Sequence, residues 1–212
     1  MHSRVAEHRW RKDNERNIRL YSERLAQHGY HVKALGWGSR VSQAKRFAVL
    51  SEVGKLSGRS VLDVGCGLGD LYAWIRRKTV RVHYLGVDIT PGMVDKARER
   101  FPKVQFRVCD LLNYSQPVSA RDYVLSSGIF THTGSFAFGF LEAMVCRMFD
   151  LSKRALAFNC LSGWADEKER GEFHADPVKV VSFCRRLTPW VVLRHDYHPR
   201  DFTVYLYKTA RL

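Results

Sequence analysis

The sequence predicts an α/β fold: a seven-stranded, mostly parallel sheet with helices on both faces, an antiparallel last strand and a helical N-terminal cap. Two observations lead to this fold class. From residue 60 onward, short apolar runs alternate with segments of helical periodicity, which is typical of parallel strands joined by helices. Only HDYHPRD separates the last two apolar runs, and this is too short for a helical crossover, so the final strand is predicted to form a hairpin.

Residues 1–58 are predicted to form the cap, and residues 59–212 the main domain. Two segments of the cap have helical spacing of apolar residues, one ending near Gly29 and one beginning after Ser39, a suitable N-cap. The apolar positions are Ile18, Tyr21 and Leu25 in the first helix and Val41, Ala44, Phe47, Ala48 and Leu50 in the second. The glycine-containing segment ALGWGSR connects them as a loop.

The main domain supplies the sheet and the helices that cover it. The predicted strands are the apolar runs 60–64, 82–87, 104–108, 122–126, 155–160, 190–194 and 202–207. The predicted helices between them are 69–77, 91–101, 136–150 and 176–187. Strands that alternate with helices in this way favour a parallel sheet that is covered on both faces.

Composition narrows the class of protein. No apolar run in the 212 residues reaches 18, and no apolar core follows the charged N-terminus, so we expect neither a membrane span nor a signal peptide. The five cysteines are scattered and form no C-x-x-C pair, which argues against a disulfide framework or a zinc cluster. We therefore predict no metal site and a reducing, cytoplasmic location.

The chain is strongly basic, with 35 Lys and Arg against 21 Asp and Glu and a net charge of +14. Residues 1–58 hold 12 of the basic and 5 of the acidic residues, which is half of the excess in about a quarter of the chain. Such a charge attracts nucleic acid, acidic membrane surfaces or small molecules that carry phosphate or carboxylate, and it equally suits a solvated surface.

A glycine-rich turn, SVLDVGCGLGD, follows the first predicted strand and places Gly65, Gly67 and Gly69 at alternate positions. In open α/β sheets, ligands bind at the carboxyl ends of the strands, where bare backbone allows a close approach. A dinucleotide fingerprint of the form G-x-G-x-x-G would need glycine at position 70, which is Asp70. The turn therefore indicates a ligand site of another kind.

Acidic residues accompany the first three predicted strands. Asp63 lies within the first strand, Asp88 ends the second and Asp110 ends the third. A carboxylate in the position of Asp88 can accept both hydroxyls of a ribose, and Asp110 with the next backbone N–H can read an adenine edge. The order of these residues predicts an adenosine-containing ligand.

The motifs VLDVGCGLGD, LGVDIT and VCDLL together resemble the class I S-adenosylmethionine-dependent methyltransferases of small-molecule type, which have a Rossmann-like fold. The resemblance covers residues 60–208 and implies S-adenosyl-L-methionine as cofactor. At the methionine end it implies a binding turn of Gly65, Cys66 and Gly67, contact of Asp63 with the ammonium group, and Ser126 facing the methionine or the acceptor.

The resemblance also implies the residues at the adenosine end. Asp88 would bind the ribose hydroxyls, Ile89 would pack on the adenine, and Asp110 with Leu111 would bind its amino edge. The N-terminal helices resemble the cap that small-molecule members fold over the site. Trp37 in that cap would close on the adenosine or the acceptor, or serve only as a packing anchor.

The segment after the fourth predicted strand reads SSGIFTH. It lacks the Asn/Asp-Pro-Pro-aromatic turn with which many methyltransferases grip the exocyclic amine of a base, and the Pro-Cys turn of cytosine-C5 methylation is absent as well. Both absences weaken a nucleic-acid acceptor despite the positive charge.

The predicted acceptor pocket lies beside the cofactor, between the cap, the segments after the fourth and fifth strands, and the last hairpin. Histidine suits proton transfer near neutral pH, and arginine suits a carboxylate or phosphate. The predicted catalytic candidates are His132, His195 and His198. The predicted substrate-binding residues are Tyr30, Lys33, Arg40, Phe130, Asn159, Tyr197 and Arg200, although Asp196 and Asp201 are alternative partners for Arg200.

The sequence thus predicts a methyltransferase that moves a methyl group to an O or N atom of a small, anionic metabolite, as a monomer or a homodimer. Two alternatives remain open. One is an RNA- or protein-directed methyltransferase that docks through its basic N-terminal helix, and the other is a non-catalytic cofactor-binding scaffold.

Overall fold

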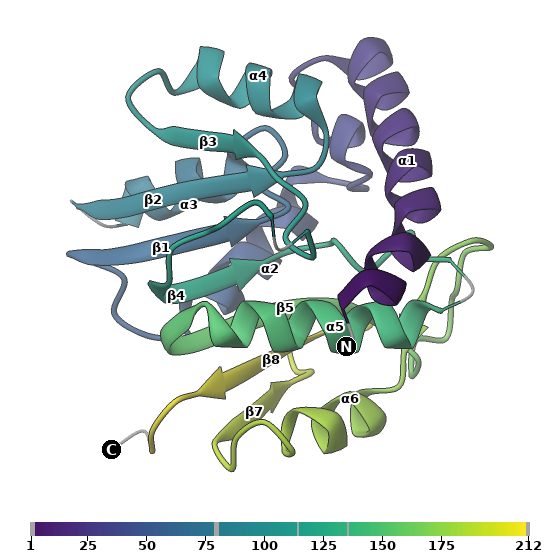
Figure 1. Ribbon diagram of the computed structural model, residues 1–212, viewed down its shortest axis with the longest axis vertical. Helices are drawn as coiled ribbons and strands as arrows, with labels where there is room; N and C mark the ends of the chain where they lie inside the picture. The colour runs from purple at the N-terminus through teal and green to yellow at the C-terminus, as the bar shows by residue number, and fades with distance from the viewer. Residues whose placement is uncertain (1–2, 79–80, 114, 135, 211–212) are drawn as a thin grey trace.

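The computed structural model describes residues 3–78, 81–113, 115–134 and 136–210. Figure 1 shows a central twisted sheet with helices on both faces and one long helix beside the strand ends. The helices are α1 (Ser3–His28), the 3₁₀-helix η1 (Val32–Leu35), α2 (Arg40–Ser51), α3 (Asp70–Lys78), α4 (Pro91–Arg100), α5 (Ala137–Asp150) and α6 (Pro177–Cys184). The strands are β1 (Arg59–Val64), β2 (Val82–Asp88), β3 (Gln105–Val108), β4 (Arg121–Ser126), β5 (Ser152–Ser162), β6 (His174–Ala175), β7 (Val191–Arg194) and β8 (Asp201–Tyr207).

The strand order is β3-β2-β1-β4-β5-β8-β7, and the short β6 pairs with β5 off this path. The strands from β3 to β5 are parallel to their neighbours, whereas β8 runs antiparallel to both β5 and β7. This confirms the predicted fold class, including the antiparallel last strand. Because the chain order reverses between β1 and β4, a ligand crevice is expected at their carboxyl ends.

Alternate side chains of β1 enter two different cores. Leu62 belongs to the core under α5 and α6, whereas Val61 belongs to the core under α2, α3 and α4. The first core includes Leu141, Val145, Met148 and Val180, and the second includes Phe47, Leu50, Ile75 and Val94. This two-sided burial explains why the parallel strands read as nearly continuous apolar runs.

The segment predicted as a cap divides into two parts with different packing. Figure 1 shows α1 running across the carboxyl ends of the parallel strands. In contrast, α2 packs on the sheet through Phe47 and Leu50, and the Tyr205 hydroxyl donates to the Val49 carbonyl at 2.6 Å. Residues 40–51 therefore pack as a layer of the main domain, although Gln43 and Phe47 of α2 also reach the cavity at the strand ends, over which α1 lies. The boundary at residue 58 remains a prediction.

The remaining differences from the predicted elements are small. The loop after α1 contains η1, which begins after His31 and ends at Gly36, and β6 was not predicted. The five cysteines are free. Within the described ranges, no helix is both long and apolar enough to cross a membrane.

Candidate functional site

A cavity lies between α1 and the carboxyl ends of β1, β2 and β4. The glycine turn after β1 forms its floor, and residues of α1 form part of its wall. Nine of the ten residues predicted to bind the cofactor line it: Trp37, Asp63, Gly65, Cys66, Gly67, Asp88, Ile89, Asp110 and Leu111. The structure therefore brings together at one place residues that are spread over more than 70 positions of the sequence.

The glycine turn is held against the end of β2 by backbone hydrogen bonds. The amides of Gly65 and Cys66 both donate to the Val87 carbonyl, at 2.8 and 3.1 Å, and the Gly67 amide donates to the Asp88 carboxylate at 2.9 Å. Gly65 and Gly67 have φ of 77° and 49°, a left-handed backbone that favours glycine. The turn can adopt this shape because both residues lack a side chain, and the shape fixes Asp88 beside it.

The carboxylates of Asp88 and Asp110 are oriented by neighbouring backbone. Asp88 also accepts from the Thr90 amide at 2.8 Å, and Asp110 accepts from the Leu112 amide at 3.0 Å. The Asn14 side chain of α1 donates to Asp110 at 2.9 Å. Burial raises the pKa of Asp88, while the backbone donors oppose that rise. Both side chains therefore keep a defined position at the cavity wall.

Asp63 differs from the other two because it is almost fully buried. The Tyr84 hydroxyl donates to its carboxylate, and burial raises the pKa of Asp63 to about 7. A buried carboxylate is stabilised by a cation placed next to it. Asn17 adds an unpartnered buried oxygen, Oδ1, at the same cavity. Both groups fit a ligand that carries a positive charge and hydrogen-bond donors, as S-adenosylmethionine does.

Ser126, the tenth predicted cofactor residue, is turned away from the cavity. It is buried and donates to the Val64 carbonyl at 2.9 Å, which ties β4 to β1, and Ser127 lines the cavity in its place. The Asn159 amide donates to Ser127 Oγ at 3.0 Å and its Oδ1 accepts from the Gly128 amide at 3.0 Å. Asn159, predicted to bind substrate, thus supports the turn after β4 from behind.

Of the three predicted catalytic histidines, only His132 lines the cavity. Its Nε2 lies 3.5 Å from the Arg24 guanidinium. Because arginine has only donors, this contact favours the tautomer in which Nε2 keeps its lone pair. Burial first, and then the charge of Arg24, lower the pKa of His132. The neutral form of the ring is therefore favoured, and this is the form that has a lone pair with which to accept a proton.

The other two histidines are engaged within the fold. His195 Nε2 lies 2.7 Å from Ser162 Oγ, and its ring stacks on Phe202 at an interplanar angle of 10°. His198 Nδ1 lies 2.8 Å from the buried carboxylate of Asp201. Neither residue lines the cavity, so the structure does not support a catalytic role for the hairpin.

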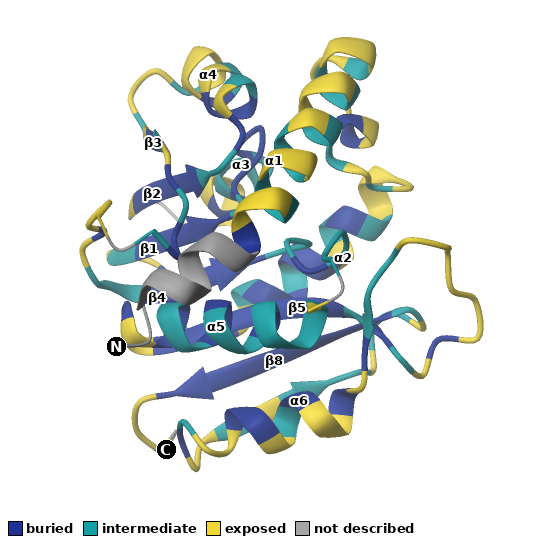
Figure 2. Cartoon of the chain, turned by 45° about the vertical axis from the view of Figure 1, so that its right-hand side comes forward, coloured by how far each residue is buried: buried dark blue, intermediate teal, exposed yellow. Residues whose placement is uncertain are grey.

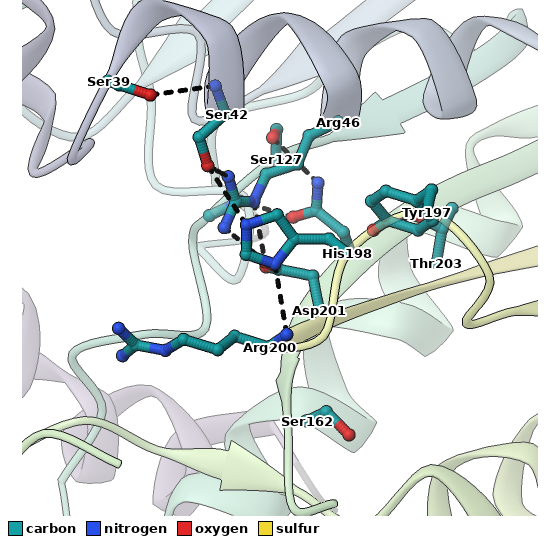
Figure 3. A network of polar contacts seen from close by, with 12 residues as sticks. Ser39, Ser42, Arg46, Ser127, Ser162, Tyr197, His198, Arg200, Asp201 and Thr203 are labelled. Atoms are coloured by element: carbon teal, nitrogen blue, oxygen red, sulfur yellow. Dashed lines mark hydrogen bonds and ion pairs between the residues drawn. The ribbon is translucent and has the colours of Figure 1, made fainter. Parts of the chain in front are cut away.

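Figure 3 shows why the hairpin is occupied: its polar side chains form a network with α2. Arg46 makes a two-pronged ion pair with Asp201, and both side chains are buried. The Arg46 guanidinium also lies over the Trp37 ring, 4.8 Å from its centroid. The network therefore links the hairpin to Trp37 and, through it, to the cavity wall.

Arg200 pairs with Glu169 and Glu172, whereas the predicted alternative partners were Asp196 and Asp201. Its guanidinium lies 3.2 Å from Glu169 and 3.0 Å from Glu172, and Figure 3 shows the side chain leading away from the network. Asp196 pairs instead with Arg194 at 2.8 Å. Two carboxylates already balance the charge of Arg200, although its buried Nε has no hydrogen-bond partner among the described residues.

The remaining predicted substrate residues also lie outside the cavity. Tyr30 lies 2.9 Å from the Glu99 carboxylate on the outer side of α4, and Lys33 and Arg40 are exposed. The Tyr197 hydroxyl lies 2.8 Å from Thr203 Oγ1. Phe130 is buried and packs edge-on against Phe140 and Phe158, so it belongs to the core.

The side chains that α1 contributes to the cavity were not predicted from the sequence. Asn14, Asn17 and Tyr21 line the cavity, and the Asn17 amide donates to the His132 carbonyl at 2.9 Å. Their spacing of three and four residues was visible, because it places all three on one face of a helix. Two of the three are polar, however, and a polar helix face usually indicates contact with solvent.

Comparison with known proteins decides the family. Residues 61–156 match the family model described as a methyltransferase domain. The Mycobacterium tuberculosis protein Rv1506c, whose name describes a methyltransferase and states no substrate, is 30% identical over 159 residues, which are 71% of this chain and 94% of that protein. The chain belongs to the class I S-adenosylmethionine-dependent methyltransferases. S-adenosylmethionine is the methyl donor of this family.

Two further similarities are more limited. Trans-aconitate 2-methyltransferase of Escherichia coli is 34% identical over 67 residues, which are 32% of this chain and only 26% of that enzyme. The structure of magnesium protoporphyrin IX methyltransferase from Synechocystis PCC 6803, described with bound SAH, has a TM-score of 0.65 at 15% identity and covers 92% of this chain and 95% of that one. At this identity the match shows that this methyltransferase shares the fold.

Proposed function

We propose that this methyltransferase transfers a methyl group to an O or N atom of a small, anionic acceptor that binds beside His132. The position of His132 carries this proposal. It lines the cavity next to the turn after β4, and its pKa is lowered by burial and by Arg24. A neutral imidazole at that place suits an acceptor that must lose a proton during transfer.

The positions of the cavity residues indicate which end of the cofactor would bind at which part of the cavity. We propose that Asp88 and Ile89 hold the ribose and adenine, that Asp110 and Leu111 hold the adenine edge, and that Asp63 lies near the ammonium group. The bound cofactor supplies a methyl group already activated by a sulfonium. The protein then needs mainly to align the acceptor, which is the part of the barrier that positioning lowers.

His132 is suited to take the proton that the acceptor atom loses. Its Nε2 carries the lone pair, and the long 3.5 Å contact with Arg24 would be exchanged for the acceptor atom when the proton is transferred; a hydrogen bond to the Gly171 backbone also holds the ring. The Asn17 amide fixes the His132 backbone through its carbonyl. The ring orientation is thus determined by groups from α1 and from the loop after β5.

An anionic acceptor is supported by charge and by the names of relatives. The chain has a net charge of +14. Several partial relatives are named trans-aconitate 2-methyltransferase, and that name describes an acceptor with three carboxylates. The predicted cytoplasmic location and the monomeric or dimeric state remain predictions. Docking of RNA or protein on the basic N-terminal helix, and an idle cofactor-binding scaffold, remain the alternatives.

The proposal is tested by incubating the purified protein with methyl-labelled S-adenosylmethionine and either a cytoplasmic small-molecule extract or total RNA. We expect label in small acidic products, and His132→Gln should abolish most of it. His195→Gln is the matched control, because that ring lies outside the cavity. Label that appears only in RNA, and that falls steeply with added salt, would favour the RNA alternative. Absence of label in both pools would favour the scaffold.

A further inference from the structure

One arginine near the cavity differs from the other arginines around it. Arg24 is half-buried, and among the residues that the structure describes no carboxylate lies within ion-pair distance of it. In comparison, Arg46 pairs with Asp201, and Arg100 pairs with Asp70 at 2.5 Å. A half-buried guanidinium without an acidic partner carries an unbalanced charge, and an anionic ligand would compensate for it.

Arg24 occupies its position because Gly36 leaves room for it. A Cβ at Gly36 would come within 2.6 Å of Arg24 Nη1, and Gly36 has a left-handed φ of 76°. The other contacts of the guanidinium are His132 Nε2 at 3.5 Å and the Tyr21 ring, whose centroid is 5.6 Å away. The loop after η1 thus holds the charge beside two residues that line the cavity.

The position of Arg24 also follows the geometry of α1. Asn14, Asn17 and Tyr21 line the cavity, and Arg24 follows Tyr21 by three residues on the same helix face. Arg24 does not line the cavity itself but lies directly behind two residues that do, Tyr21 and His132. Asn14 lies at Asp110, the end proposed to hold the adenine, whereas Arg24 lies at His132, the end proposed to hold the acceptor. The site is therefore acidic at the cofactor end and positive at the acceptor end, which matches a cationic donor and an anionic acceptor.

We infer that the Arg24 guanidinium binds a carboxylate group of the acceptor, and that the acceptors are small carboxylic acids. The inference rests on the proposed methyl transfer beside His132. The planar fork of arginine matches the two oxygens of a carboxylate, and each N–H···O bond is charge-assisted. With the acid held there, another O or N atom of the acceptor lies within reach of the neutral His132 ring.

The inference is tested by calorimetry on the full chain saturated with S-adenosylhomocysteine. The probes are fumarate, citrate and benzoate, together with benzamide as the neutral counterpart of benzoate, and inorganic phosphate. We expect at least one acid to bind and benzamide not to bind. Arg24→Gln should weaken binding of the acid about 10- to 100-fold, the range for loss of charge-assisted hydrogen bonds, with unchanged affinity for S-adenosylhomocysteine. Arg24→Lys keeps the positive charge but loses the planar, two-pronged geometry of the guanidinium. Its affinity for the acid should lie between that of the unaltered protein and that of Arg24→Gln.

Two matched variants control for general effects. Arg19→Gln removes the same charge from an exposed position of α1 and should leave acid binding unchanged. Gly36→Ala should weaken acid binding by displacing Arg24. Gly58→Ala meets the same left-handed strain, with φ of 72°, but contacts nothing within 4 Å, so it should not weaken binding.

Three results would overturn the inference: binding by none of the acids, acid binding that Arg24→Gln leaves intact, or binding of phosphate in place of the acids. Failure of the proposed function gives a different result. In that case an acid binds in an Arg24-dependent way, but labelled S-adenosylmethionine transfers no methyl group to it, or His132→Gln transfers it at the rate of the unaltered protein.

Discussion

Two regions of the sheet's carboxyl edge, the end near β1 and β2 and the end near β8, both carry buried acidic residues. They differ in whether a basic side chain pairs with the acid. At the end near β1 and β2, Asp63 and Asp88 face a cavity, and within the described part of the chain no ion pair involves Asp63. At the end near β8, Asp201 is enclosed by Arg46 and His198. Figure 2 shows β8 buried along its length and the long loop beyond this end of the sheet largely exposed. An acidic residue at a strand end is thus available to a ligand only where no basic side chain covers it.

One sheet edge thus separates residues that stabilise the fold from residues that are available to a ligand. The buried ion pair of Arg46 and Asp201 joins α2 to β8. The acids around the glycine turn, Asp63 and Asp88, face the cavity and are available to a ligand. Substitutions at the two ends should therefore have different readouts: unfolding at the β8 end, and ligand affinity or turnover at the β1 end.

The largest effect is expected from Arg46→Met. It leaves the Asp201 carboxylate buried without its two-pronged partner, which typically costs about 3–5 kcal/mol of unfolding free energy. Urea unfolding followed by circular dichroism measures this loss. Arg200→Met is the control: its ion pairs are partly exposed, so its cost should stay below about 1 kcal/mol. Equal stability of the two variants would show that the β8 end does not depend on the buried pair.

The next effect is on turnover. His132→Gln should lower kcat about 100-fold or more with an acceptor that must lose a proton, because general-base catalysis contributes on that scale. His198→Gln should instead lower stability and leave kcat within a few-fold of the unaltered protein, because His198 lies outside the cavity. If His198→Gln gave the larger loss of kcat at matched folding, the roles assigned to the two ends would be reversed.

The same two ends show what the sequence could predict. The strands, the glycine turn and the positions of Asp63, Asp88 and Asp110 follow from local spacing, because a strand that ends in a tight turn places its last residues at the sheet edge. The ion-pair partners of Arg46 and Arg200, in contrast, lie far away in the sequence. Neither the pairing of Arg46 with Asp201 nor that of Arg200 with Glu169 and Glu172 can be read from spacing, since each joins segments that only the tertiary fold brings together.

The N-terminal region was only partly predictable for a related reason. Amphipathic spacing predicts that a helix such as α2 buries one face, but it does not say which surface covers that face. The helix α2 was expected over the ligand; it packs on the sheet through Phe47 and Leu50, and its Gln43 and Phe47 also line the cavity. In α1 the informative residues were polar, Asn14 and Asn17, and their contact with the cavity is a property of the assembled site.

A smaller effect is expected at the ribose position. Asp88→Ala should weaken S-adenosylmethionine and S-adenosylhomocysteine binding about 10- to 100-fold, because the ribose hydroxyls lose a charged acceptor. Calorimetry measures both ligands. Asp95→Ala removes an exposed carboxylate from α4 and should leave both affinities unchanged. Equal binding by the Asp88 and Asp95 variants would remove Asp88 from the cofactor site.

The smallest effect concerns pH and belongs to Asp63. Burial raises the pKa of Asp63 to about 7 in the free protein, so below that pH its carboxyl is largely protonated. A cationic cofactor group beside it favours the ionised form, and binding at lower pH must therefore release a proton. Affinity for S-adenosylmethionine should rise up to about tenfold per pH unit as pH approaches 7 from below, and level off above it.

The matched variant for this effect is Asp63→Asn, which keeps the size of the side chain and removes its titration. We expect it to bind the cofactor more weakly at pH 8 but with little change between pH 6 and pH 8. Calorimetry in two buffers with different ionisation enthalpies reports the proton release directly. If the unaltered protein released no proton near pH 6, or if Asp63→Asn kept the slope, the carboxyl that couples to the cofactor would be another one, and Asp88, whose pKa burial also raises, would be the next to test.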